Sequence, residues 1–341
     1  MDNKKRNRAI LLALLGVVGL VIVFVVKPSS KQWYKLSGVV WNTEYHITYY
    51  GTSDMTDSLN NVLRTVELSV SPFNKASRVT AINENSTDTL DGYLLRLYRK
   101  SLEINRESGG AFDPTVSPLV NAWGFGYKSG EMPDSADVDS MLRFVGIAKT
   151  SIVGENRLVK PDSRMTFNFS AIAKGMGSDE VGRMFARNGI ENYMVEIGGE
   201  IVVAGTNPKG GKWRVSIDKP INDNDSIIHA SAEVIGVSGV GIATSGNYRN
   251  YKIDDNGRRY AHTINPLTGY PEQTDVLSAT VVAPDCMTAD AYATTFMVLG
   301  LKRSQALVAR HPELAVMLIT MAPDGSYRYW HSSTYRPLVV E

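Results

Sequence analysis

A carboxylate and a hydroxyl stand four residues apart in the segment Thr288-Ala-Asp-Ala-Tyr-Ala-Thr-Thr295. At that spacing, Asp290 and Thr294 share one face of a helix. Such a pair suits Mg²⁺ when carbonyl, water or phosphate oxygens complete the coordination shell. The alternative is that Asp290 caps the helix and Thr294 bonds back to a carbonyl. Spacing alone favours that alternative, so the metal hypothesis depends on the other polar segments.

Small residues gather at the start of a helix that we predict from Ser170, as its cap, to about Asn188. They would let a ligand approach the backbone N–H groups, where the helix dipole favours an anion. Lys174 lies in the first turn, where a cation is locally unfavourable and a bound phosphate would resolve the conflict. The alternative is a solvated surface lysine. In that case Gly175 and Gly177 would cost helix stability without visible gain.

Two further segments are polar and rich in turns. In the first, 110–126, Asp113 precedes a proline and is therefore extended or in a turn. It either presents a carboxylate to a ligand or closes an Asx turn, and by itself the turn is favoured. The second comprises 244–251 and 260–271. His262 lies there at a strand-to-turn corner, where a histidine can be exposed as a general base, although a lone histidine is more often structural.

The elements that would position these residues follow from hydrophobic periodicity. We predict helices at 57–69, 90–108, 134–144, 170–188, 288–299 and 304–310. We predict strands at 39–50, 150–159, 193–205, 213–217, 227–238, 277–283, 314–320 and 327–331. Strands dominate the second half without a regular βαβ alternation, which indicates an α+β fold: a single large mixed α/β domain.

The N-terminus predicts a membrane anchor. A basic stub at 1–8 precedes an uncharged apolar run at 9–26, long enough to nearly span a bilayer. A cleaved signal peptide is the alternative, but no A-x-A-like site follows. The basic cluster favours a cytoplasmic N-terminus. We therefore expect a single-pass transmembrane helix in a bacterial inner membrane, a linker at 27–37, and a catalytic domain at 38–341 on the periplasmic, extracytoplasmic side.

Composition excludes some functions. The chain has 36 Lys and Arg against 35 Asp and Glu, so it lacks the basic excess typical of nucleic-acid binding. Its single cysteine, Cys286, excludes an intramolecular disulfide and a cysteine-rich metal site.

Taken together, the polar segments resemble the ApbE-type family, the FAD:protein FMN transferases. Six motifs match in the family's order and cover nearly the whole chain after Trp41: 110–126, 168–179, 198–201, 244–251, 262–271 and 290–294. The resemblance implies an α+β domain with a flavin cleft. It implies Mg²⁺ held by Asp290, Thr294 and the carbonyl of Ala171, with Ala293 nearby.

The resemblance also implies how FAD is bound. Lys174 would contact FAD, Asp113 would bind its adenosine or flavin part, and Ile264 corresponds to the position after the family's histidine. The remaining expected flavin contacts are Trp41, Phe73, Asn74 and Lys75. Asn168 and Asn265 stand where the family usually has Asp. They keep the turn geometry but remove two charges, so either the metal binds more weakly or these positions are not ligands. The second alternative is favoured because the implied metal ligands are intact.

The implied reaction is Mg-dependent transfer of FMN from FAD to a threonine hydroxyl through a phosphoester bond, with AMP leaving and His262 as the base. The implied acceptors are exported proteins with a Ser/Thr motif, subunits of membrane redox complexes. Two alternatives stay open: an FAD pyrophosphatase that gives FMN and AMP, and a non-catalytic flavin-binding module. A flavin oxidoreductase is disfavoured because no nicotinamide fingerprint is visible.

Overall fold

The computed structural model describes Asn7 and residues 30–126, 132–220, 231–246, 251–253, 259–272, 274–322 and 324–341, without the side chains of 251–253 and 259–261. The predicted anchor at 9–26 lies outside the described residues, as does the basic stub apart from Asn7. Within the described ranges, no helix combines the length and the apolar character needed to cross a membrane.

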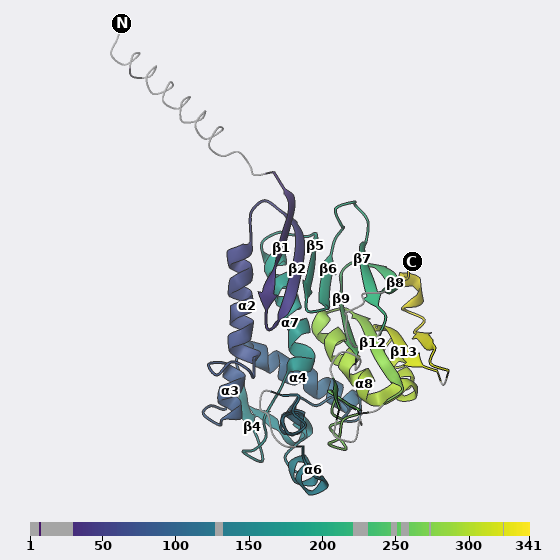
Figure 1. The fold of residues 1–341 in the computed structure, drawn as a ribbon. Helices are drawn as coiled ribbons and strands as arrows, with labels where there is room; N and C mark the ends of the chain where they lie inside the picture. The colour runs from purple at the N-terminus through teal and green to yellow at the C-terminus, as the bar shows by residue number, and fades with distance from the viewer. Residues whose placement is uncertain are drawn as a thin grey trace.

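An eight-stranded antiparallel sheet forms the centre of the domain (Figure 1). Its strands lie side by side in the order in which they occur along the chain. They are β1 (Gln32–Val40), β2 (Thr43–Gly51), β5 (Tyr193–Ile197), β6 (Glu200–Ala204), β9 (Val240–Gly246), β12 (Val276–Ala283), β13 (Ala315–Met321) and β14 (Tyr327–His331). With the helices below, this confirms the predicted mixed α/β domain.

The first two strands correct the sequence prediction. β1 begins at Gln32, so the predicted linker at 27–37 extends too far and the domain starts before residue 38. The single strand predicted at 39–50 is in fact a hairpin, turning at Trp41 and Asn42. Both residues have positive φ, 50° and 60°, as a two-residue type I′ turn requires. A tryptophan is not a typical residue for that conformation, so the sequence did not indicate the turn.

Two long helices, α7 (Ser170–Arg187) and α8 (Cys286–Val308), pack together and against the sheet. α2 (Thr56–Val70) packs against α7, and α4 (Gly92–Glu107) packs against both α7 and α8. α8 is broken at Gly300 (φ 70°, ψ 172°), where two helices were predicted. Smaller elements complete this side: α3 (Arg78–Asn83), α5 (Ser117–Ala122), α6 (Ser135–Leu142), and the hairpin of β3 (Ser151–Val153) and β4 (Arg157–Val159).

A second hydrophobic layer joins the sheet to the hairpin of β7 (Trp213–Asp218) and β8 (Ser231–Val237). The C-terminal residues seal it: the Val340 N–H donates to the Val234 carbonyl at 2.8 Å, and the Val234 N–H donates to the Glu341 carbonyl at 2.7 Å. Another short hairpin, β10 (Tyr251–Ile253) with β11 (Arg259–Ala261), leads toward His262. β9, this hairpin, α3 and α5 were not predicted as elements. The single strand predicted at 193–205 is two strands, β5 and β6, that turn at Gly198 and Gly199.

Candidate active site

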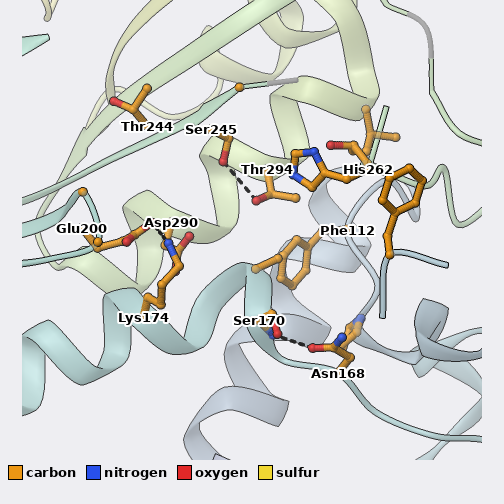
Figure 2. Close-up of a pocket in the computed structure, with 18 of the residues that line it drawn as sticks. Phe112, Asn168, Ser170, Lys174, Glu200, Thr244, Ser245, His262, Asp290 and Thr294 are labelled. Carbon is orange, nitrogen blue, oxygen red and sulfur yellow. Dashed lines mark hydrogen bonds and ion pairs between the residues drawn. The ribbon is translucent and has the colours of Figure 1, made fainter. Parts of the chain in front are cut away.

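A cavity of about 670 Å³ lies between the start of α7, the middle of α8, the ends of β6 and β9, and β7. This volume is in the range of pockets that bind cofactors. Of the predicted site residues, the cavity wall includes Phe73, Asp113, Ala171, Lys174, His262, Ile264, Asp290 and Thr294. Figure 2 shows Lys174 and Asp290 at one end and His262 at the other, with Thr294 between them.

The crossing of α7 and α8 explains the glycine at the start of α7. A Cβ on Gly175 would lie 2.3 Å from the Cys286 carbonyl oxygen and 2.8 Å from the Asp290 Cβ. Only glycine therefore lets the two helices touch, and its N–H donates to Asp290 Oδ2 at 3.0 Å. Gly177 similarly admits the Trp41 ring, 2.4 Å from where its Cβ would be. These glycines serve helix packing, and not the close ligand approach that the sequence suggested.

Asp290 and Thr294 face the cavity from α8, as their spacing predicted. Asp290 is only 3% exposed, and burial raises the pKa of its carboxyl, against the lowering effects of Lys174 and the Gly175 N–H. The Thr294 Oγ1 lies 3.2 Å from the Ser245 Oγ on β9. A buried carboxylate beside two hydroxyls is a hard-oxygen donor set that fits Mg²⁺.

That set is incomplete by itself. The described residues contain no group of three histidine, cysteine or acidic side chains that could enclose a metal. Backbone carbonyls and ligand oxygens would have to supply the remaining contacts. Mg²⁺ commonly binds in this way, through one or two carboxylates plus substrate phosphates. Ala171 lines the cavity at the first turn of α7, where its carbonyl was expected to serve.

Lys174 is paired with Glu200, the first residue of β6, in a close ammonium–carboxylate contact. Burial lowers the pKa of Lys174, but the carboxylates of Glu200 and Asp290 outweigh burial and raise it, so the ammonium stays charged. Lys174 is thus not the solvated lysine of the alternative interpretation. Sequence reasoning gave Glu200 no role, although it lies in the matched Gly-Gly-Glu motif at 198–201.

Asp113 lines the cavity, but its oxygens are already used. They accept from the Thr115 N–H at 2.8 Å, the Thr115 hydroxyl at 2.6 Å and the Ile147 N–H at 2.8 Å. Asn105 Nδ2 donates a further bond at 3.2 Å. The bonds to Thr115 form an Asx turn, and the bond to Ile147 holds a second loop against it. An Asx turn is what the position of Asp113 before a proline favoured by itself.

The turn after β11 forms the opposite wall, with His262, Thr263 and Ile264. The His262 ring lies edge-on to Phe125 at 6.5 Å between centroids. Asn265 Oδ1 accepts the Leu267 N–H at 2.9 Å, and its amide donates to Glu272. Asn265 does not line the cavity. An aspartate there would set two carboxylates against each other, which explains the departure from the family pattern.

The other departure, Asn168, has a capping role. Its Oδ1 accepts the Ser170 N–H at 2.9 Å, and its own N–H donates to the Pro114 carbonyl at 2.8 Å. Ser170, predicted to cap α7, is instead the first residue of the helix, and Phe169 occupies the N-cap position without a side-chain bond.

Four predicted site residues lie away from the cavity wall. Trp41 packs between the hydrophobic clusters beside α7, and Ala293 is fully buried in the core. Asn74 donates to Glu67 Oε1 at 2.9 Å, and Lys75 is exposed. Their neighbour Phe73 does reach the cavity and is 59% exposed. The structure therefore brings Ala171, Asp290 and Thr294 together with Lys174, but neither Ala293 nor more than one member of the 73–75 segment.

The chain is similar to known proteins over most of its length. The model of the ApbE family matches residues 41–318. A Vibrio cholerae protein named FAD:protein FMN transferase is 35% identical over 337 residues, covering 96% of this chain and 98% of that protein. The Escherichia coli K12 protein of that name is 31% identical over 315 residues, covering 90% of this chain and 88% of the other.

Solved structures agree in fold. The flavin transferase ApbE from Vibrio cholerae superposes with a TM-score of 0.81 at 34% identity, covering 90% of this chain and 99% of that one. The apo flavinyl transferase ApbE of Pseudomonas stutzeri gives a TM-score of 0.78 at 27% identity, covering 90% of this chain and 97% of the other.

Proposed function

This chain belongs to the ApbE family, and we propose that its cavity transfers FMN from FAD to a threonine of an acceptor protein, with AMP as the leaving group. It is an FAD:protein FMN transferase, as its relatives are named. The observation that carries the finer proposal is the buried Asp290 carboxylate facing the cavity beside the hydroxyls of Thr294 and Ser245.

We propose that Asp290, Thr294 and the Ala171 carbonyl hold Mg²⁺ with the FAD pyrophosphate. When bound, the ion would neutralise the pyrophosphate and the charge that develops on the leaving phosphate. The Gly175 N–H fixes Asp290 Oδ2 and thereby orients the carboxylate toward the cavity. Lys174 adds a positive charge at the same end, where it would stabilise phosphate oxygens.

At the other end of the cavity, His262 is the proposed general base for the threonine hydroxyl. A neutral imidazole can take the hydroxyl proton as the oxygen attacks the FMN phosphorus. The phosphoanhydride bond to AMP then breaks. Phe73, exposed at the cavity wall, would contact the flavin. Asp113 supports the wall through its turn and would touch FAD only with the edge of its carboxylate.

The test uses the full chain with FAD, Mg²⁺ and an exported flavoprotein domain that carries a Ser/Thr motif. Intact mass spectrometry should show one added FMN on the acceptor and release of AMP, both abolished by EDTA. Replacement of the acceptor threonine by valine should prevent the addition. Release of free FMN and AMP with an unmodified acceptor would instead support a pyrophosphatase. Bound FAD without either product would support a flavin-binding module.

We also propose that the segment at 9–26 anchors the chain in the inner membrane with the catalytic domain outside the cytoplasm. The basic residues before the apolar run support this orientation. The domain would then face exported subunits of membrane redox complexes. Protease added to intact spheroplasts should digest the domain while a cytoplasmic marker survives. Protection of the domain until the membrane is lysed would contradict the proposal.

A further inference from the structure

Glu200 contacts the lysine of the cavity from across the fold. It begins β6, immediately after the Gly198–Gly199 turn, and its side chain is 5% exposed. Oε1 pairs with the Lys174 ammonium, whereas Oε2 is buried and has no hydrogen-bond partner. An unpartnered carboxylate oxygen is costly to bury. Burial raises the pKa of the Glu200 carboxyl to about 8, against the lowering effect of the Lys174 ammonium, so its ionised form depends on that ion pair.

Lys174 has a second carboxylate within reach. Its neighbour Gly175 donates its N–H to Asp290, so lysine and aspartate lie on adjoining turns of α7 and α8 (Figure 2). Yet within the described part of the chain the ammonium forms its ion pair with Glu200, and no ion pair joins it to Asp290. Asp290 therefore keeps an oxygen for another cation.

We propose that Glu200 is a positioning residue: it holds Lys174 away from Asp290 and so keeps the Asp290–Thr294 pair free to bind a divalent cation. Without Glu200, Asp290 is the other carboxylate among the described residues whose charge acts on the ammonium. Lysine and cation would then compete for the same oxygen. With Glu200 in place, the ammonium and the cation have separate partners, and both charges can act on the pyrophosphate.

The inference rests on the cation site proposed above, and its test measures cation binding without turnover. Mn²⁺ alone serves as the probe, titrated by calorimetry into the full chain without FAD. Four proteins form a double-mutant cycle: wild type, Glu200→Gln, Lys174→Met and the double variant. Glutamine keeps the shape of Glu200 and removes its charge, and methionine keeps the stem of Lys174 without the ammonium.

Glu200→Gln should weaken Mn²⁺ binding roughly tenfold, because the Lys174 ammonium then competes with the cation for the Asp290 carboxylate. Lys174→Met should then restore the affinity, and its effect should be roughly tenfold larger in the Glu200→Gln background than in the wild type, because contacting residues are coupled. Equal effects of Lys174→Met in both backgrounds would show that Glu200 only adds charge, and would overturn the proposal. So would unchanged affinity in Glu200→Gln.

Glu180→Gln is the matched control. Glu180 lies on α7 with a 5% exposed side chain, but it pairs with Arg96 and Arg183 and does not line the cavity. Its replacement should leave Mn²⁺ affinity unchanged, and a thermal unfolding curve for each variant confirms folding. The outcomes separate the two proposals. If Lys174→Met and Glu200→Gln are coupled in Mn²⁺ binding but no FMN is transferred, the proposed function is refuted and the positioning role of Glu200 stands. FMN transfer without this coupling would support the function and refute the positioning role.

Discussion

The two ends of the cavity are built differently. The helix end comprises Lys174, Asp290 and Thr294 with Glu200, and it is fixed by the direct contact of α7 with α8. The turn end comprises residues 262–271, held by side-chain bonds within a turn such as that of Asn265 to Glu272. Of the charged groups at the helix end, Lys174 and Asp290 lie on packed helices and Glu200 begins β6. The proposed base lies on a turn, which an acceptor segment could approach.

This contrast predicts the largest loss at the helix end. Asp290→Asn should reduce FMN transfer by about 10³-fold, because a carboxylate ligand of the cation supplies several kcal/mol of transition-state stabilisation. The thermal midpoint should not fall, since burial already disfavours the ionised form of Asp290. Intact mass spectrometry and a thermal melt measure the two effects. Transfer close to the wild-type rate would place the cation elsewhere.

At the turn end, His262→Gln should slow transfer by about 10²-fold, a typical loss for a general base. FAD affinity and Mn²⁺ affinity should stay as in the wild type, because the helix end is untouched. Single-turnover kinetics and flavin fluorescence titration separate these effects. His331→Gln is the control, a histidine on β14 paired with Glu233 at 2.8 Å. A parallel loss of FAD affinity in His262→Gln would contradict a role in the chemical step.

Gly175→Ala probes the helix crossing itself. The added methyl would overlap the Cys286 carbonyl and Asp290, so the free energy of unfolding should fall by about 3 kcal/mol, and Mn²⁺ binding should weaken. Gly92→Ala is the control, because nothing lies within 4 Å of its Cβ at the start of α4. Urea unfolding measures both. If Gly175→Ala and Gly92→Ala unfold with the same free energy, then α7 and α8 can move apart without loss of stability, which would contradict the tight helix crossing.

The helix end should also respond to pH through Asp179. This carboxylate accepts the Cys286 and Met287 N–H groups at the start of α8, and burial raises its pKa to about 6. A raised pKa in the folded state contributes stability below the unfolded value, and that contribution is lost as pH rises toward 6. Relative to Asp179→Asn, the wild type should lose about 2 kcal/mol between pH 4 and pH 7. Urea unfolding of both proteins at the two pH values measures the difference. If the two proteins differ in unfolding free energy by the same amount at both pH values, the pKa of Asp179 is not raised by folding.

The smallest effect is expected within the turn. Asn265→Asp should destabilise the chain by about 1–2 kcal/mol, because the amide that donates to Glu272 becomes a second carboxylate. Adding Glu272→Gln should restore the thermal midpoint. Mn²⁺ affinity should not change in either variant, since Asn265 does not line the cavity. Tighter Mn²⁺ binding by Asn265→Asp would show that this position can bind the metal. The cation site would then not be confined to the helix end of the cavity.

Periodic patterns predicted the long helices but not the six-residue helices α3 and α5. They also placed Asp290 and Thr294 together, because residues four apart share one face of a helix. The sequence could not predict the partner of Lys174. Glu200 lies 26 residues further on, and sheet register decides where it points. The β1–β2 turn was missed because Trp41 adopts a conformation that its residue type disfavours. The glycines of α7 were noticed, but their partners on α8 and β1–β2 are set by tertiary packing.

The order of strands in the sheet has a consequence for biosynthesis. Each strand joins the edge left by the strand before it, so the sheet can extend in one direction as the chain becomes available from its N-terminal end. α8 follows β12, and Asp290 therefore enters a sheet with six strands already laid down. The carboxylate expected to capture the cation is among the last groups to arrive. Metal loading would then follow folding of the sheet and would not nucleate it.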